Sequence, residues 1–208
     1  MERNNTEWIV KTLEARAKEL QPFAVYLSCS TRSALESMVL VVKGHRGVAE
    51  TAGGAPLSGR DGAALKSAFE RLGWGAADED AQYWCGVLLT PLKAEPLADA
   101  RLRLLIESID PTVIVTLDEH ARLALVGVLL EEKSFVRRLP QPPTKGGASA
   151  SSPSQTAQWL PKTTTDAGGR LLVSVDGFEA ALDSDTSKQR VWQQLKQAAY
   201  SEALKRFK

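Results

Sequence analysis

Residues 38–42 read MVLVV, a continuous apolar run that contains no polar side chain. Such a run is typical of a parallel strand that is covered on both faces. Three similar runs follow along the chain, YWCGVLL at 83–89, TVIVTL at 112–117 and LLVSV at 171–175. The four runs predict the strands of one central parallel sheet.

The segments between these strands carry apolar residues at helical spacing. Because strands alternate with helices, the pattern predicts a three-layer α/β/α fold with a central parallel four-stranded sheet and right-handed crossovers. One segment is ambiguous: FAVYLSC, at 23–29, fits either a short strand or an extended connection. The expected helices are 6–20, 60–74, 97–109, a segment capped by Asp118, and a final segment capped by Ser184 or Asp185.

Residues 139–169 differ in composition from the rest of the chain. Eighteen of these 31 residues are Pro, Gly, Ser or Thr, and the only large apolar side chains are Leu139, Trp159 and Leu160. Such a stretch buries too little apolar surface to offset the entropy lost on ordering. We therefore expect a single domain, residues 1–208, with a flexible insertion at 139–169.

The overall composition is that of an ordinary globular protein. Hydrophobic residues make up 43% of the 208 residues, charged residues 25%, and the formal net charge is +1. No global positive field therefore favours nucleic acid. The two cysteines, Cys29 and Cys85, are too few for a structural zinc or iron–sulfur site. We expect free thiols, no metal or other cofactor, no membrane span and a cytoplasmic location.

Ligands of parallel α/β sheets bind at the carboxyl ends of the strands. The loops predicted to lie there are Lys43–Gly59, Pro91–Pro96, Asp118–His120 and Asp176–Asp183. These loops carry the sequence features that bear on function.

Four segments resemble the uracil-DNA glycosylase superfamily, in particular its families 4 and 5. They occur in the same order as in those enzymes, and the resemblance covers roughly residues 36–200. It implies the same three-layer fold and an ancestral pocket that accepts a flipped base. The segments are GGAPLSGRDGAALKSAFERLGW (53–74), IDPTVIVTLDEHARLAL (109–125), KSFVRRLP (133–140) and TSKQRVWQQLKQA (186–198).

The positions that carry catalysis in the resembled enzymes are replaced in this chain. Gly44 stands where the family has an acid, and Leu57 stands where it has a stacking Phe. The base-reading Asn corresponds approximately to Cys85, and Asp176 replaces the His that stabilises the departing uracil anion. A carboxylate at that point repels the anion. The resemblance therefore implies a degenerate pocket and no catalytic residue.

Two sets of charged residues leave alternatives open. Glu50 or Asp61 is a candidate substitute for the missing acid, although loop carboxylates are usually only solvated. A basic set is a candidate for phosphate or DNA contact through charge and backbone amides, and its alternative is a solvated surface. The basic set consists of Lys43, His45, Arg46, Arg60, Arg137 and Arg138.

Three functions fit the sequence. The end of the chain is similar to that of the psi subunit of bacterial DNA polymerase III, a non-catalytic bridging protein. The first hypothesis is therefore a non-catalytic interaction or DNA-associated subunit in DNA replication or repair, with a protein partner. The alternatives are a divergent DNA glycosylase and a DNA- or nucleotide-binding module. A filled or acidic pocket favours the first hypothesis, whereas a concave positive surface favours the binding module.

Overall fold

The computed structural model describes residues 11–12, 14–74, 83–90, 98–131, 165–167, 170–175 and 177–206. No helix in these ranges is long and apolar enough to cross a membrane.

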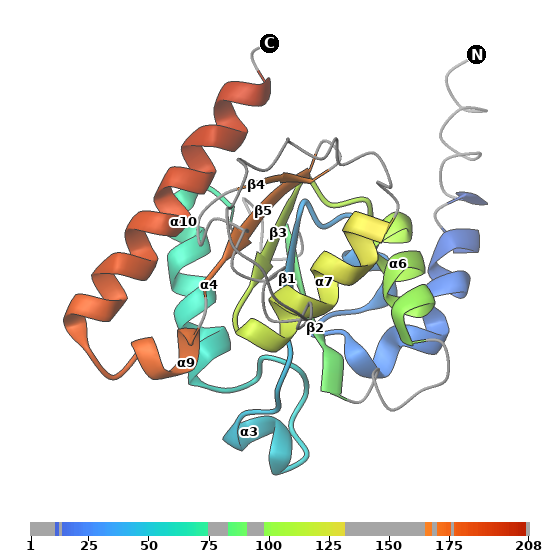
Figure 1. Ribbon diagram of the computed structural model, residues 1–208. Helices are drawn as coiled ribbons and strands as arrows, with labels where there is room; N and C mark the ends of the chain where they lie inside the picture. Colours follow the sequence, from blue (N-terminus) through green and yellow to red (C-terminus); the bar gives the residue numbers. More distant parts are fainter. Residues whose placement is uncertain are drawn as a thin grey trace, which may run out of the picture.

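A central sheet contains the four predicted strands. They are β1 (Val39–Lys43), β2 (Trp84–Leu88), β3 (Val113–Thr116) and β5 (Arg170–Ser174). These strands are mutually parallel and lie in the order β2-β1-β3-β5 (Figure 1). The predicted three-layer α/β/α fold with a parallel four-stranded sheet is confirmed.

A fifth strand extends the sheet beyond β5. Strand β4 (Thr165–Ala167) pairs antiparallel with β5 and forms one edge of the sheet. It corrects the prediction that the whole of 139–169 is a flexible insertion, because backbone pairing with β5 orders even the short polar sequence TDA. The remainder of that predicted insertion lies outside the described residues.

Helices connect the strands largely as the apolar spacing predicts, and the described residues 14–20 of the first predicted helix are helical. Residues 23–29 correct the expectation of a strand or extended connection, because most of them belong to a 3-10 helix with a proline in its first turn. The helices are η1 (Gln21–Tyr26), α2 (Thr31–Leu35), α3 (Val48–Thr51), α4 (Arg60–Leu72), α6 (Ala98–Ile109), α7 (Glu119–Glu131), α9 (Phe178–Ala181) and α10 (Asp185–Arg206).

The helices form two layers, one on each face of the sheet (Figure 1). Alternate β1 side chains point to opposite faces, so Leu40 and Val42 join one buried cluster and Val39 and Val41 join the other. The first cluster includes side chains of η1, α6 and α7, and the second includes side chains of α4, α9 and α10. Burial on both faces explains why the strands read as continuous apolar runs.

The outer edge of β2 is partly covered by the segment that follows η1. Leu27 forms an isolated antiparallel bridge with Val87. The backbone N–H of Ser28 donates to the carbonyl of Gly86 at 2.8 Å, and the N–H of Gly86 donates to Ser28 Oγ at 2.7 Å. These bonds satisfy backbone groups that an open edge strand exposes.

Candidate functional site

The candidate site lies at the carboxyl end of β1, between the sheet and the layer that contains α4 and α9. Lys43 is the last residue of β1 and lies two residues after Val41, so its side chain points to the same face as Val41. The first turns of α4 and α9 place Asp61 and Glu179 on that face. Within the predicted loop Lys43–Gly59, the first residue still belongs to β1, and four of the following residues form the short helix α3.

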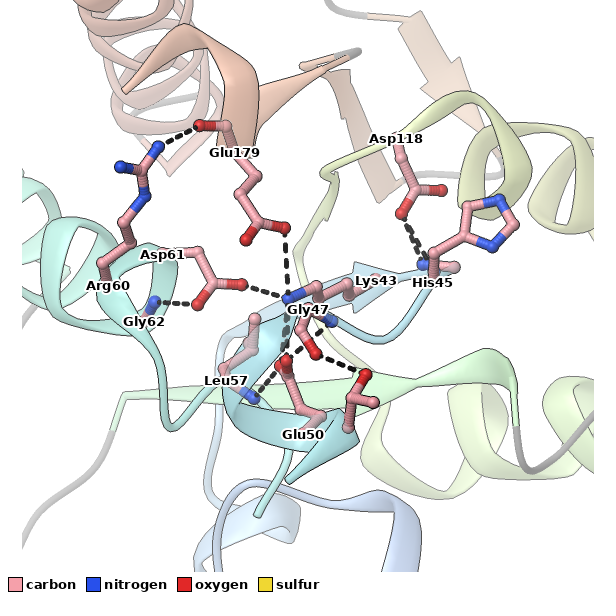
Figure 2. Close-up of polar contacts among 12 residues, drawn as sticks. Lys43, His45, Gly47, Glu50, Leu57, Arg60, Asp61, Gly62, Asp118 and Glu179 are labelled. Atoms are coloured by element: carbon pink, nitrogen blue, oxygen red, sulfur yellow. Dashed lines mark hydrogen bonds and ion pairs between the residues drawn. The ribbon is translucent and has the colours of Figure 1, made fainter. Parts of the chain in front are cut away.

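Lys43, Glu50 and Asp61 form a buried charge cluster (Figure 2). The ammonium Nζ of Lys43 donates to Glu50 Oε1 at 3.0 Å and Oε2 at 3.1 Å, and it also donates to Asp61 Oδ2. Glu179, half exposed, adds an ion pair at 3.9 Å. Lys43, Glu50 and Asp61 are only 5%, 4% and 2% exposed, so the two carboxylates are stabilised by the shared ammonium rather than by water.

Burial and hydrogen bonding act in opposite directions on the Lys43 ammonium. Burial lowers the pKa of Lys43, because the charged form loses hydration. Hydrogen bonds and charges from Asp61 and Glu50 outweigh this effect, so the pKa of Lys43 is raised above its ordinary value. The amine therefore stays protonated at neutral pH and does not serve as a base or a nucleophile.

Glu50 also holds the backbone of the loop between β1 and α4. Glu50 is the third residue of α3, and its Oε2 accepts the backbone N–H of Gly47, the residue before the helix, at 2.8 Å. Its Oε1 accepts the N–H of Leu57 at 3.0 Å. Leu57 has a φ of 57°, a left-handed conformation that costs a non-glycine residue about 1–2 kcal/mol. The carboxylate helps to keep this strained turn in place.

These contacts correct two expectations from the sequence. Glu50 and Asp61 are not solvated loop carboxylates, because both are buried against Lys43. Lys43 does not face outward as a phosphate contact, because its ammonium is occupied by carboxylates. The sequence carried a signal for this: Lys43 continues the inward-facing alternation of Val39 and Val41.

A cavity of about 780 Å³ lies beside the charge cluster. Arg60 lies at its wall, where the guanidinium donates to the Glu179 carbonyl at 3.0 Å and to Asp183 Oδ1 at 2.7 Å. The charge of Arg60 is therefore paired. Four carboxylates line the cavity, and the only basic side chains beside them among the described residues are Arg60 in the lining and Lys43 in the adjoining charge cluster. The surface is acidic rather than positive. The lining residues are Val48, Ala49, Glu50, Gly59, Arg60, Asp61, Glu179, Ala180 and Asp183.

Position 44 has no space for a side chain. A Cβ at Gly44 would lie 2.3 Å from Asp118 Oδ1. Asp118 Oδ2 instead accepts the N–H of Gly44 at 2.7 Å and of His45 at 3.2 Å, and Oδ1 accepts the N–H of Ala121 at 2.8 Å. Asp118 therefore caps α7, as predicted, and also ties two loops together, which the sequence did not predict.

Leu57 packs against the middle of β2. A Cβ on Gly86 would lie 2.2 Å from Leu57 Cδ1, so the leucine side chain occupies the space directly above that glycine. The neighbouring Cys85 is fully buried and faces the opposite cluster. Aliphatic contact therefore fills the space above Gly86, and the Cys85 thiol lies on the other face of the sheet.

The remaining predicted residues do not join this arrangement. His45 and Arg46 are exposed, and the His45 ring lies 4.5 Å from that of His120, centroid to centroid. Asp176, Arg137 and Arg138 lie outside the described residues. The structure thus brings together Lys43 and Arg60 from the basic set, with Glu50 and Asp61, around an acidic cavity.

Comparison with protein-family models and with curated proteins found no match to this chain.

Proposed function

We propose that the chain is a non-catalytic uracil-DNA glycosylase-like protein that acts as an interaction or DNA-associated subunit in DNA replication or repair. The observation that carries the proposal is the buried charge cluster. It occupies the carboxyl end of β1, where α/β folds of this class bind their ligands. All the strong hydrogen-bonding atoms of Lys43 and Glu50 are directed to protein groups.

Electrostatics support the same proposal. Four carboxylates around the cavity repel DNA phosphates and disfavour a departing uracil anion, whereas a glycosylase needs donors aimed at that anion. The same surface suits a protein partner with basic residues. Val48, 84% exposed at the cavity rim, adds apolar area of the kind that protein interfaces bury.

An excision assay tests the absence of catalysis. The pure full chain is incubated with an equal concentration of uracil-containing single- or double-stranded oligonucleotide. Abasic sites are then cleaved with alkali. We expect no excision above buffer, because a water-positioning group and an anion donor each contribute about 10²–10³ in rate. Clear turnover by the unmodified chain overturns the proposal.

One observation favours the alternative, a divergent glycosylase. Asp61 is a buried carboxylate that lines the cavity, and it is a candidate to position water. Its oxygens, however, accept from Lys43 and from the N–H of Gly62 at 2.9 Å. If excision occurs, Asp61→Asn should abolish it while Asp183→Asn, at the exposed rim, should retain it.

Affinity capture tests the interaction. The full chain is used as bait in extract of its own cells, and captured replication and repair proteins are quantified against an unrelated bait. We expect their enrichment, and its loss in Glu179→Lys/Asp183→Lys. The matched variant Glu70→Lys, on the exposed side of α4, should retain it. Capture without any replication or repair protein contradicts the proposal.

A further inference from the structure

The two cysteines are brought together in the fold although 56 positions separate them in sequence. Cys29 lies in the segment between η1 and α2, and Cys85 lies in β2. The thiol of Cys29 donates to Cys85 Sγ, and the two sulfur atoms are 2.8 Å apart. This separation is closer than ordinary van der Waals contact of two sulfurs. Both residues are free thiols.

We propose that Cys29 and Cys85 are an oxidative modification site, at which a peroxide converts the two thiols into an intramolecular disulfide that locks the η1–α2 segment onto the edge of β2. The inference is independent of the proposed function. It rests on the proximity of the sulfurs and on the exposure of the pair, because Cys29 is partly exposed and Cys85 is fully buried. A small oxidant therefore reaches Cys29 first.

The reaction has two balanced steps. The sulfur of Cys29 attacks one oxygen of hydrogen peroxide, so that an S–O bond forms, the O–O bond breaks and one water leaves. The sulfur of Cys85 then attacks the sulfur of Cys29. The S–S bond forms, the S–O bond breaks, and the oxygen leaves with the thiol proton as a second water. Two thiols are oxidised and one peroxide is reduced.

The location gives the disulfide its structural consequence. The segment at Leu27 and Ser28 already covers β2 through backbone bonds to Val87 and Gly86. In the reduced protein these bonds and the burial of Leu27 in the first cluster hold it by noncovalent contacts, and its local opening exposes an edge strand able to pair with another chain. In the oxidised protein the covalent bond at Cys29–Cys85, immediately beside those bonds, prevents the opening.

The reaction should be slow. The hydrogen bond to Cys85, together with burial, raises the pKa of Cys29 well above its ordinary value. Because the thiolate is the attacking species, little of Cys29 is reactive at neutral pH. The site therefore responds to sustained oxidation rather than to a brief pulse, and the oxidation rate should increase with pH.

Mass spectrometry and hydrogen exchange on the folded full chain test the proposal. After peroxide treatment, quenching and proteolysis, we expect a peptide pair linked through Cys29 and Cys85, with the mass of two hydrogen atoms lost. Closing a loop of this length predicts a rise in Tm of about 10 °C, reversed by dithiothreitol. Amide exchange in 27–30 and 84–88 should slow at least about tenfold.

The variant Cys29→Ser is the matched control, because it keeps a hydroxyl donor of similar size and leaves the buried Cys85 unchanged. Peroxide should produce no crosslink, no rise in Tm and no added exchange protection in it. Oxidation of unmodified Cys29 to sulfinic acid in the folded chain without a link to Cys85 overturns the proposal. If the disulfide forms but amide hydrogen exchange in 84–88 does not change, the proposal that it holds the η1–α2 segment on β2 is wrong.

Discussion

Lys43 is the residue on which the local arrangement of the site depends most. It is the only cation within the buried charge cluster, and it is bound by Glu50 and Asp61. A buried ion pair adds little net stability by itself, because desolvation offsets attraction. Removing one partner is different, since it leaves the other charges buried and unpaired.

The first prediction is a large loss of stability in Lys43→Met. The free energy of unfolding should fall by about 3–5 kcal/mol, because Glu50 and Asp61 then face each other without a cation. Urea denaturation followed by circular dichroism measures it. The control is Lys188→Met, which removes an exposed ion pair with Asp185 and should change stability by less than about 1 kcal/mol. Equal effects of the two variants would refute the buried pairing.

The pKa of Lys43 predicts how this contribution varies with pH. Because the pKa is raised in the folded state, the stabilisation is complete below the ordinary lysine pKa of about 10.4 and is lost as the pH rises through the folded value. The difference in unfolding free energy between the unmodified chain and Lys43→Met should therefore be smaller at about pH 11.5 than at about pH 8. A difference that does not change with pH contradicts the assignment.

At the scale of elements, the contact between α4 and the loop before it is the tightest backbone approach at the site. A Cβ on Gly62, in the first turn of α4, would lie 1.7 Å from the carbonyl oxygen of Leu57. The left-handed turn at Leu57 and the start of α4 therefore require each other. Any side chain at position 62 has to displace backbone.

Two glycine substitutions in helices test this approach. Gly62→Ala should lower the free energy of unfolding by about 3 kcal/mol, the upper range for overpacking. Gly127→Ala, in α7, has no heavy atom within 4 Å of the new Cβ and should raise stability by up to about 1 kcal/mol. Thermal and urea unfolding measure both. A neutral Gly62→Ala would show that the turn at Leu57 moves freely.

The elements that the sequence predicted are those whose pattern is long and apolar. Strand β1 and helix α4 each bury a continuous run or a periodic stripe, which a single sequence displays. Helix α3 has four residues and strand β4 has three, so neither repeats its period often enough to display a pattern in the sequence. At the site, the inward direction of Lys43 was readable from alternation. Its pairing with Asp61 was not, because it depends on how α4 packs.

At the scale of the whole molecule, one sheet separates two apolar clusters, and every described strand belongs to that sheet. Adjacent residues of one strand serve opposite clusters, as Ile114 and Val115 do in β3. Neither helical layer has a core without the sheet. We therefore expect the described part of the chain to unfold as one cooperative unit.

Leu105→Ala, in the first cluster, tests cooperativity. Leu105 is fully buried in α6, so its truncation should cost about 2–5 kcal/mol. Because the layers share the sheet, the urea transitions followed by circular dichroism and by tryptophan fluorescence should move together and stay coincident. Leu104→Ala, at a half-exposed neighbouring position, should cost less than about 1 kcal/mol. Two separate transitions would contradict a single unit.

The charge cluster also has an evolutionary consequence. Lys43, Glu50 and Asp61 come from a strand end, a short helix and a second helix. Loss of Lys43 alone leaves two buried carboxylates without a cation, whereas loss of one carboxylate leaves Lys43 paired with the other. A lineage that loses Lys43 while it keeps both carboxylates passes through a poorly folding intermediate. In descendants of this chain, a replacement of Lys43 should therefore be accompanied by replacement of Glu50 and Asp61, whereas either carboxylate can change first.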